Sequence, residues 1–172
     1  MSASNLIRVI PDFPKPGIIF KDITPLLANA KAFKNVCMQI ADHATEVEYI
    51  AGIEARGFIF ASAVAAIANK GLIPIRKSGK LPGKTYSTSY DLEYGKATLE
   101  IHSDLIPVGG KVLLVDDVLA TGGTAIAAID LIKMAGLSPI TFAFLLEIPA
   151  LGGRSRIAKS HSGLQIQTIL AE

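Results

Sequence analysis

The sequence contains no tryptophan and a single cysteine, Cys37. One cysteine excludes a disulfide framework within the chain, so the fold must depend on a hydrophobic core. Cys37 lies within an apolar helical pattern, which favours a small buried side chain over a reactive thiol. We therefore expect a protein of a reducing, cytoplasmic compartment.

Long apolar runs and a strong charge of one sign are also missing. No stretch of roughly 18 or more apolar residues occurs, and the first ten residues lack the apolar core of a signal peptide. The 17 Lys and Arg residues nearly balance the 15 Asp and Glu residues, so we expect neither nucleic acid nor a membrane as a partner. The three histidines are scattered, without metal-ligand spacing, and we expect no metal site built by the protein.

The chain of 172 residues, half of them apolar, is long enough for one domain with its own core, which we place at residues 1–172. Strand patterns alternate with helix patterns and predict an α/β fold, with a mainly parallel central sheet flanked by helices and ligands at the carboxyl ends of its strands. The predicted strands cover residues 49–53, 72–76, 97–102, 111–115, 139–146 and 164–170, and the predicted helices cover 33–44, 58–69 and 124–135.

Three features interrupt this alternation. Prolines between residues 10 and 27 leave little room for helix. Pro74 places its strand at an edge or a bulge. Residues 77–95 show no apolar period, which is typical of a functional or mobile connection.

The segment VLLVDDVLATGGT, at residues 112–124, carries the clearest chemistry. Asp116 and Asp117 follow a buried strand and are placed to accept hydrogen bonds from vicinal ribose hydroxyls. Gly122 and Gly123 allow a turn that aims backbone N–H groups inward, and the next helix adds about half a positive charge. This combination favours a phosphate monoester joined to a sugar. The spacing matches neither the Walker A loop nor GxGxxG, and the simplest alternative is a helix cap and glycine turn without a ligand.

This segment resembles the motif of type I phosphoribosyltransferases that binds phosphoribosyl pyrophosphate (PRPP). Three further segments resemble those of adenine phosphoribosyltransferases, in the same order along the chain. They are PDFPKPGIIFKDITPLL at residues 11–27, GIEARGF at 52–58 and RKSGKLPGKTYSTSYDLEYG at 76–95. The resemblance implies a homodimeric enzyme that uses Mg²⁺ and transfers the phosphoribosyl group from PRPP to adenine, giving AMP and pyrophosphate.

The resemblance also implies a role for each segment. A hood at roughly residues 1–30 covers the base, with Phe20 stacking on it and the backbone of Ile19 and Lys21 reading its edge. Some relatives have arginine where this chain has Lys21. Residues 52–58 form the pyrophosphate loop, in which the resemblance places a cis peptide between Glu54 and Ala55. Arg56 supplies a planar donor fork for phosphate oxygens. The 5′-phosphate is assigned to the loop of Ala120, Thr121, Gly122, Gly123 and Thr124.

A mobile flap at roughly residues 77–95 completes the expected site. Its basic cluster of Arg76, Lys77, Lys80 and Lys84 is expected to neutralise pyrophosphate and exclude water. Glu93, beside Tyr94, corresponds to a glutamate that lies near the base, and we expect it to act as general acid or base. Asp116 and Asp117 are expected to stabilise positive charge on the sugar carbon during transfer. Mg²⁺ is expected to bind through pyrophosphate, ribose hydroxyls and water.

Two alternatives remain open at this stage. The chain can be a phosphoribosyltransferase for xanthine, hypoxanthine or orotate, because backbone recognition of a base leaves no side-chain signature. It can also be a PRPP-sensing regulator without catalytic activity, although no basic nucleic-acid-binding segment accompanies the domain.

Overall fold

The computed structural model describes residues 3–92, 95–104 and 106–170. Its main sheet contains seven strands, namely β3 (Tyr49–Ile53), β4 (Gly71–Lys77), β5 (Thr85–Leu92), β6 (Gly95–His102), β7 (Lys111–Leu119), β8 (Ser138–Glu147) and β9 (Gln165–Thr168). They lie in the order β5-β6-β4-β3-β7-β8-β9. The neighbours from β4 to β9 are parallel, whereas β5 and β6 are antiparallel additions at one edge. The predicted α/β fold with a mainly parallel sheet is confirmed.

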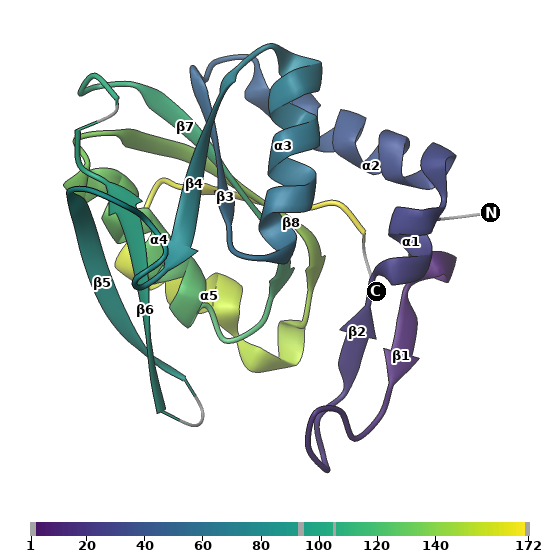
Figure 1. Cartoon of the computed structure of the whole chain (residues 1–172). Coiled ribbons are helices and arrows are strands. Elements are labelled where there is room, and N and C mark those ends of the chain that lie inside the picture. The colour runs from purple at the N-terminus through teal and green to yellow at the C-terminus, as the bar shows by residue number, and fades with distance from the viewer. Residues whose placement is uncertain (1–2, 93–94, 105, 171–172) are drawn as a thin grey trace.

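Helices cover both faces of this sheet (Figure 1). The helices α2 (Ala30–Ala41) and α3 (Arg56–Ala68) pack on one face, and α4 (Gly123–Met134) and α5 (Gly153–Ser160) pack on the other. Alternate residues of β7 divide between the two cores: Leu114 packs with α4, and Leu113 packs with α3. Because both faces are covered, the central strands read as continuous apolar runs.

The α3 helix lies unusually close to the sheet. A Cβ atom on Gly52 of β3 would lie 2.6 Å from Cβ of Ala61 in α3. Small residues on both elements are therefore required for this contact. Cys37 of α2 lies in the same layer, where burial raises the pKa of its thiol to about 11, consistent with the small buried side chain that was expected.

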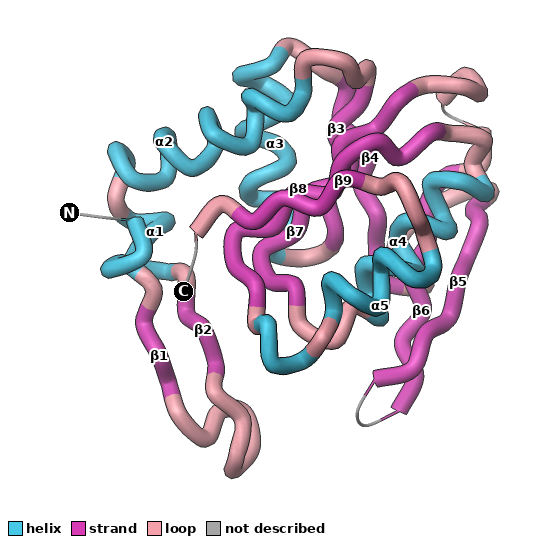
Figure 2. The backbone as a smooth tube through the Cα atoms, turned by 180° about the vertical axis from the view of Figure 1, so that it is seen from behind, coloured by secondary structure: helices cyan, strands magenta, loops and turns pink. Residues whose placement is uncertain are grey.

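A small N-terminal sheet forms the predicted hood, and Figure 2 shows it beside the main sheet and separate from it. It pairs β1 (Arg8–Ile10) with β2 (Phe20–Asp22) and follows the 3-10 helix η1 (Ala3–Leu6). Asp22 joins the two strands and the following turn, since it accepts hydrogen bonds from Arg8 and from the backbone and hydroxyl of Thr24.

The expectation of little helix between residues 10 and 27 was wrong at its end, where α1 (Thr24–Ala28) begins. Pro25 lies in the first turn of α1, where a missing N–H costs nothing. Two more 3-10 helices, η2 (Asp42–Ala44) and η3 (Pro149–Leu151), follow α2 and β8. Within the described part of the chain, no helix is long and apolar enough to cross a membrane.

Three further predictions need revision. Much of the segment at residues 77–95 forms β5, which pairs with β6 along its length. The strand predicted at residues 111–115 continues to Leu119, so Asp116 and Asp117 lie within β7 and not after it. Pro74 lies in an internal strand, but β4 pairs with β6 at Arg76 and Lys77, beyond the proline. Pro74 itself therefore has no paired residue on the β6 side, as in an edge strand.

Candidate active site

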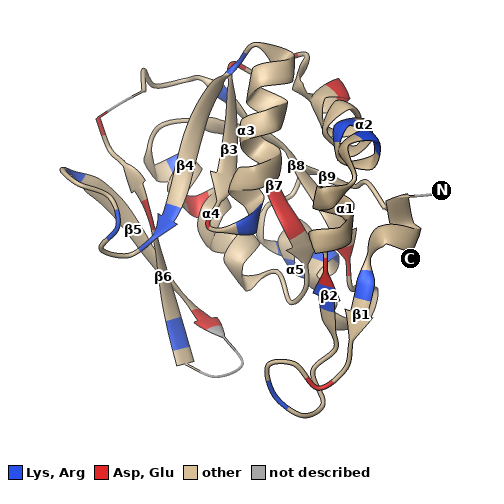
Figure 3. Cartoon of the chain, turned by 45° about the vertical axis from the view of Figure 1, so that its right-hand side comes forward, with Lys and Arg blue, Asp and Glu red and all other residues tan. Residues whose placement is uncertain are grey.

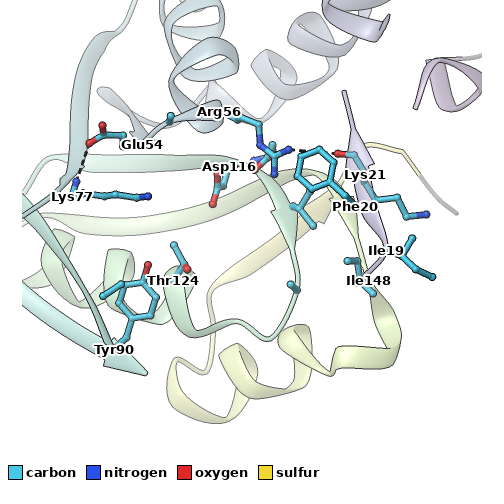
Figure 4. Close-up of a pocket in the computed structure, with 15 residues that line it drawn as sticks. Ile19, Phe20, Lys21, Glu54, Arg56, Lys77, Tyr90, Asp116, Thr124 and Ile148 are labelled. Carbon is cyan, nitrogen blue, oxygen red and sulfur yellow. Dashed lines mark hydrogen bonds and ion pairs between the residues drawn. The ribbon is translucent and has the colours of Figure 1, made fainter. Parts of the chain in front are cut away.

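A cavity of about 510 Å³ opens between the hood, the ends of β3 and β7, and the β5–β6 hairpin (Figure 4). The structure brings many of the predicted site residues to its wall. They are Ile19, Phe20, Lys21, Glu54, Ala55, Arg56, Lys77, Asp116, Asp117, Ala120 and Thr124. These residues come from four separate segments of the chain, so the fold assembles in one place what the sequence presents in pieces.

The acidic pair lies near the end of β7, where Figure 3 shows a red stretch of the strand. Asp117 is buried, and its Oδ2 atom lies 2.6 Å from Nε of Arg56. The two groups form an ion pair without the alignment of a hydrogen bond. Burial raises the pKa of Asp116 well above its usual value, and the negative charge of Asp117 raises it further. The pair therefore resists carrying two negative charges, and Arg56 is the cation that lies against it.

Arg56 is the first residue of α3 and also reaches the hood strand β2. Its guanidinium lies 5.0 Å from the ring centroid of Phe20, and Nη1 is 3.5 Å from the Lys21 carbonyl oxygen. The expected cis peptide between Glu54 and Ala55 is present directly before it. Gly57 follows, and a Cβ atom there would lie 2.9 Å from the Val115 carbonyl oxygen. The glycine lets the start of α3 approach β7 closely enough for the ion pair.

Glu54, two residues before Arg56, also lines the cavity. Its carboxylate accepts hydrogen bonds from Nζ of Lys80 at 2.9 Å and from the Lys77 backbone at 3.0 Å, and Arg76 contributes two longer ones. The hydrogen bond from Lys80, with those from Lys77 and Arg76, lowers the pKa of Glu54 to about 2 although burial opposes this shift. Within the described structure, Arg76 and Lys80 thus bind Glu54 and lie outside the cavity wall.

The turn between β7 and α4 lines the main cavity and a second cavity of about 70 Å³ next to it. Thr121, Gly122 and Gly123 line this second cavity together with Ala120 and Thr124. Gly122 has φ of +82°, and its carbonyl accepts the Ile126 N–H at 3.0 Å. The first N–H groups of α4 have no partner within the helix. They are available to an anion, which the helix dipole also favours.

The hood supplies the apolar end of the cavity. The Phe20 ring contacts Phe13 edge to face, with a centroid separation of 5.1 Å, and the Arg56 guanidinium lies over the same ring. Figure 4 shows Ile19, Lys21 and Ile148 around the same end. A flat aromatic ligand fits this environment, since it can stack on a ring and present its edge to backbone groups.

Sequence reasoning missed four residues of the wall, namely Tyr90, Ala97, Val118 and Ile148. Val118 lies inside the recognised motif, so its position next to Asp117 was a usable signal. Tyr90 and Ala97 reach the cavity through the pairing of β5 with β6, and Ile148 through the end of β8, which no local pattern indicated. Glu93 and Tyr94, both predicted to act in the site, lie outside the described residues.

No group of three or more His, Cys, Asp or Glu side chains suited to a metal ion occurs among the residues that the structure describes. Asp116 and Asp117 offer hard oxygen donors at the cavity, although Asp117 is already paired with Arg56. This donor set is compatible with a divalent cation that arrives with an anionic substrate and keeps most of its ligands from substrate and water.

Comparison with known proteins agrees with this geometry. A family model described as the phosphoribosyl transferase domain matches residues 21–168. The adenine phosphoribosyltransferase of Frankia casuarinae is 57% identical over 154 residues, which cover 88% of this chain and 82% of that protein. The chain belongs to the adenine phosphoribosyltransferase family.

Solved structures of adenine phosphoribosyltransferases share the fold over nearly the whole chain. That from Thermoanaerobacter pseudethanolicus is 43% identical, with a TM-score of 0.91, and the match covers 97% of this chain and 96% of that one. That from Saccharomyces cerevisiae, solved with adenine and an imino-altritol bisphosphate, is 34% identical, with a TM-score of 0.89 and 98% of each chain covered.

Proposed function

We propose that this chain transfers the 5-phosphoribosyl group from PRPP to adenine, giving AMP and pyrophosphate as a step of purine salvage. One observation carries the proposal: a cavity lined by an acidic pair and an aromatic hood adjoins a smaller one lined by a glycine turn at a helix start. These are the features needed for a ribose, a phosphate and a base. The related yeast enzyme was solved with adenine and a sugar-like bisphosphate, which supports the same division of the site.

The proposed reaction is a displacement at the anomeric carbon of PRPP. The turn formed by residues 120–124 holds the 5′-phosphate through backbone N–H groups and the hydroxyls of Thr121 and Thr124. Asp116 and Asp117 accept hydrogen bonds from the ribose hydroxyls. Their negative charge also stabilises the cationic character that develops on the sugar as pyrophosphate departs.

Pyrophosphate is proposed to leave toward Arg56 and the backbone at Glu54 and Ala55. The planar guanidinium of Arg56 suits phosphate oxygens, and its present contact with Asp117 keeps it at the cavity. Lys77 lines the same wall, and Lys80 and Arg76 lie behind it on Glu54. Mg²⁺ bound to pyrophosphate, ribose hydroxyls and water would add charge neutralisation there.

Adenine is proposed to stack on Phe20, with its edge facing the backbone of Ile19 and Lys21. A backbone carbonyl opposite position 6 accepts from the adenine amino group. The same carbonyl would face an oxygen in hypoxanthine or guanine and leave two acceptors opposed. Glu93, near Tyr94, is proposed as the general acid or base at a ring nitrogen.

Three broader features belong to the same proposal. The hood at roughly residues 1–30 covers the base, and the segment at roughly residues 77–95 acts as a flap over PRPP within a single domain. The cytoplasm is the proposed compartment, supported by a lone buried cysteine. A homodimer is also proposed. It is supported by α3, which begins at Arg56 and exposes Ile59 and Ile67.

The deciding experiment is an assay of the purified protein with PRPP, Mg²⁺ and a panel of adenine, hypoxanthine, guanine, xanthine and orotate. We expect AMP formation from adenine with the highest kcat/KM. A higher kcat/KM for a 6-oxo base would refute the choice of adenine. PRPP binding without product from any base would favour the regulator.

Light scattering on the same sample should give twice the 18.1 kDa chain mass, and a monomer would exclude the proposed dimer.

A further inference from the structure

The segment after β8, for which the sequence indicated no chemistry, lies directly against the phosphate loop at residues 120–124. α5 begins at Gly153, and a Cβ atom there would lie 2.2 Å from the Ala120 carbonyl oxygen and 3.1 Å from the Gly122 nitrogen. Neither atom can yield, because both belong to the backbone. The start of α5 and the phosphate loop therefore pack backbone against backbone, which only glycine at position 153 permits.

Arg156 extends from α5 onto the same loop. Its Nη1 atom donates a hydrogen bond to the Thr121 carbonyl oxygen at 3.4 Å and lies 3.8 Å from the point where a Cβ of Gly123 would be. The Tyr90 ring and the Asp91 carbonyl of β5 lie 3.4 Å from the same point. The phosphate loop therefore contacts both α5 and β5.

A network around Arg154 fixes α5 to the sheet. Arg154 donates to Glu147 of β8 at 2.5 to 3.1 Å, to the Ile166 carbonyl at 2.9 Å and to the Thr168 hydroxyl at 2.7 Å. These contacts tie the helix to β8 and β9, two residues before Arg156. Arg156 consequently projects from a rigid support.

We propose that Arg156 is a positioning residue for the 5′-phosphate subsite, an inference that rests on the proposed function of the loop. The carbonyl and N–H of a trans peptide point in opposite directions. A donor on the Thr121 carbonyl therefore fixes the plane of the Thr121–Gly122 peptide and the direction of the Gly122 N–H. The guanidinium also brings a positive charge to a loop that receives a phosphate dianion.

The test compares AMP with adenosine, which differ in the phosphate. Dissociation constants of both ligands are measured by calorimetry for the wild type, Arg156→Ala and Arg156→Lys. We expect Arg156→Ala to weaken AMP binding about tenfold, the size of one charge-assisted hydrogen bond at an exposed site, and to leave adenosine binding unchanged. Arg156→Lys should recover part of the loss. The KM for PRPP should rise in Arg156→Ala with little change in kcat.

Lys159→Ala, which removes an exposed cation from the same helix, is the matched control and should behave as the wild type. An unchanged ratio of AMP to adenosine affinity in Arg156→Ala would overturn the inference, and so would an equal loss for both ligands. If Arg156→Ala does not fold, the ratio of AMP to adenosine affinity is measured for Arg156→Gln instead, and the same outcomes apply. A wild-type protein that forms no AMP from adenine and PRPP would refute the proposed function. The ratio of AMP to adenosine affinity tests only the role of Arg156, so the two failures are distinguishable.

Discussion

Nε of Arg56 lies 2.6 Å from Oδ2 of Asp117, which pairs the first residue of α3 with a buried carboxylate of β7. The contact joins the proposed pyrophosphate loop to the proposed ribose-binding pair. The same guanidinium lies over Phe20 of the hood. One arginine thus touches three walls of the cavity, and its charge is balanced by an acid that is itself assigned to the substrate.

This pairing predicts strong coupling between the two residues. Arg56→Gln and Asp117→Asn should each lower kcat/KM for PRPP by on the order of a hundredfold, because each removes a substrate contact and leaves a charge without its partner. The kcat/KM of the double variant should fall by much less than the product of the two losses, because the second substitution removes a group that the first has already left unpaired. Steady-state kinetics of the four proteins measure this. Losses that simply multiply would show that the two residues act independently.

The ionised side chain of Asp116 lowers the stability of the folded protein. Burial and the charge of Asp117 raise its pKa above the ordinary value of 3.8, so the folded protein holds this proton more tightly than the unfolded chain. The free energy of unfolding therefore falls as pH rises from about 4 through the raised pKa, and it stays lower above that pKa. Asp116→Asn carries no such penalty. We expect this variant to have a higher Tm than the wild type at pH 7 and a much lower activity.

The gain in Tm should shrink as pH falls and should vanish only below the ordinary pKa of 3.8, where the wild-type carboxyl is protonated in both states. Calorimetry at several pH values measures it. Asp104→Asn, at an exposed carboxylate, serves as the control and should show no comparable gain. A Tm of Asp116→Asn at or below that of the wild type at pH 7 would count against a strained acid at this position.

The sequence predicted the central sheet well because its strands are buried on both faces. The prediction for β3 matched Tyr49–Ile53 residue for residue. It failed for β5, where hydroxyl residues occupy an edge strand. This strand is stabilised by pairing with β6 and by contacts with α4, including Thr88 with Met134. Such stability comes from tertiary partners, so no local period in the sequence records it.

The site residues likewise divide into those that a contiguous motif predicts and those that only tertiary contacts bring to the cavity. Asp116, Asp117 and the loop that follows them were predictable because one contiguous motif carries them. Tyr90 and Ile148 were not, because each reaches the cavity only through the pairing of a distant segment. The Glu54 network was also missed, since the basic cluster gave no sign that a partly buried acid would bind Arg76 and Lys80.

Glu93 is predicted to carry the proton transfer. Glu93→Gln keeps the size of the side chain but removes its ability to exchange a proton, so kcat should fall by roughly a hundredfold or more. The KM for PRPP should change little, because this role concerns the base. Steady-state kinetics across pH measure both effects, and the limb of the pH profile that belongs to this group should disappear. Asp91→Asn, which removes a carboxylate two positions earlier in the sequence, is the control, and unchanged turnover in Glu93→Gln would remove the residue from the mechanism.

Glu54 is predicted to stabilise the fold in a way that depends on pH. The hydrogen bond from Lys80 is the main cause that lowers its pKa from 4.5 to about 2. The stabilisation is therefore complete above about pH 4.5 and is lost as pH falls through about 2. Glu54→Gln is isosteric but uncharged, so its Tm should lie below that of the wild type at pH 7. The two proteins should converge as the pH is lowered, because the wild type loses the same charge.

Glu46→Gln, at an exposed glutamate, separates this effect from a general change in net charge, because it removes one negative charge without a buried partner. Its Tm should follow the wild type across the same pH range. Glu54→Gln should also raise the KM for PRPP, since Arg76 and Lys80 lose the acid that holds them behind Lys77. A Tm difference between Glu54→Gln and the wild type that stays constant from pH 7 to pH 2 would mean that the contact contributes by shape and not by charge.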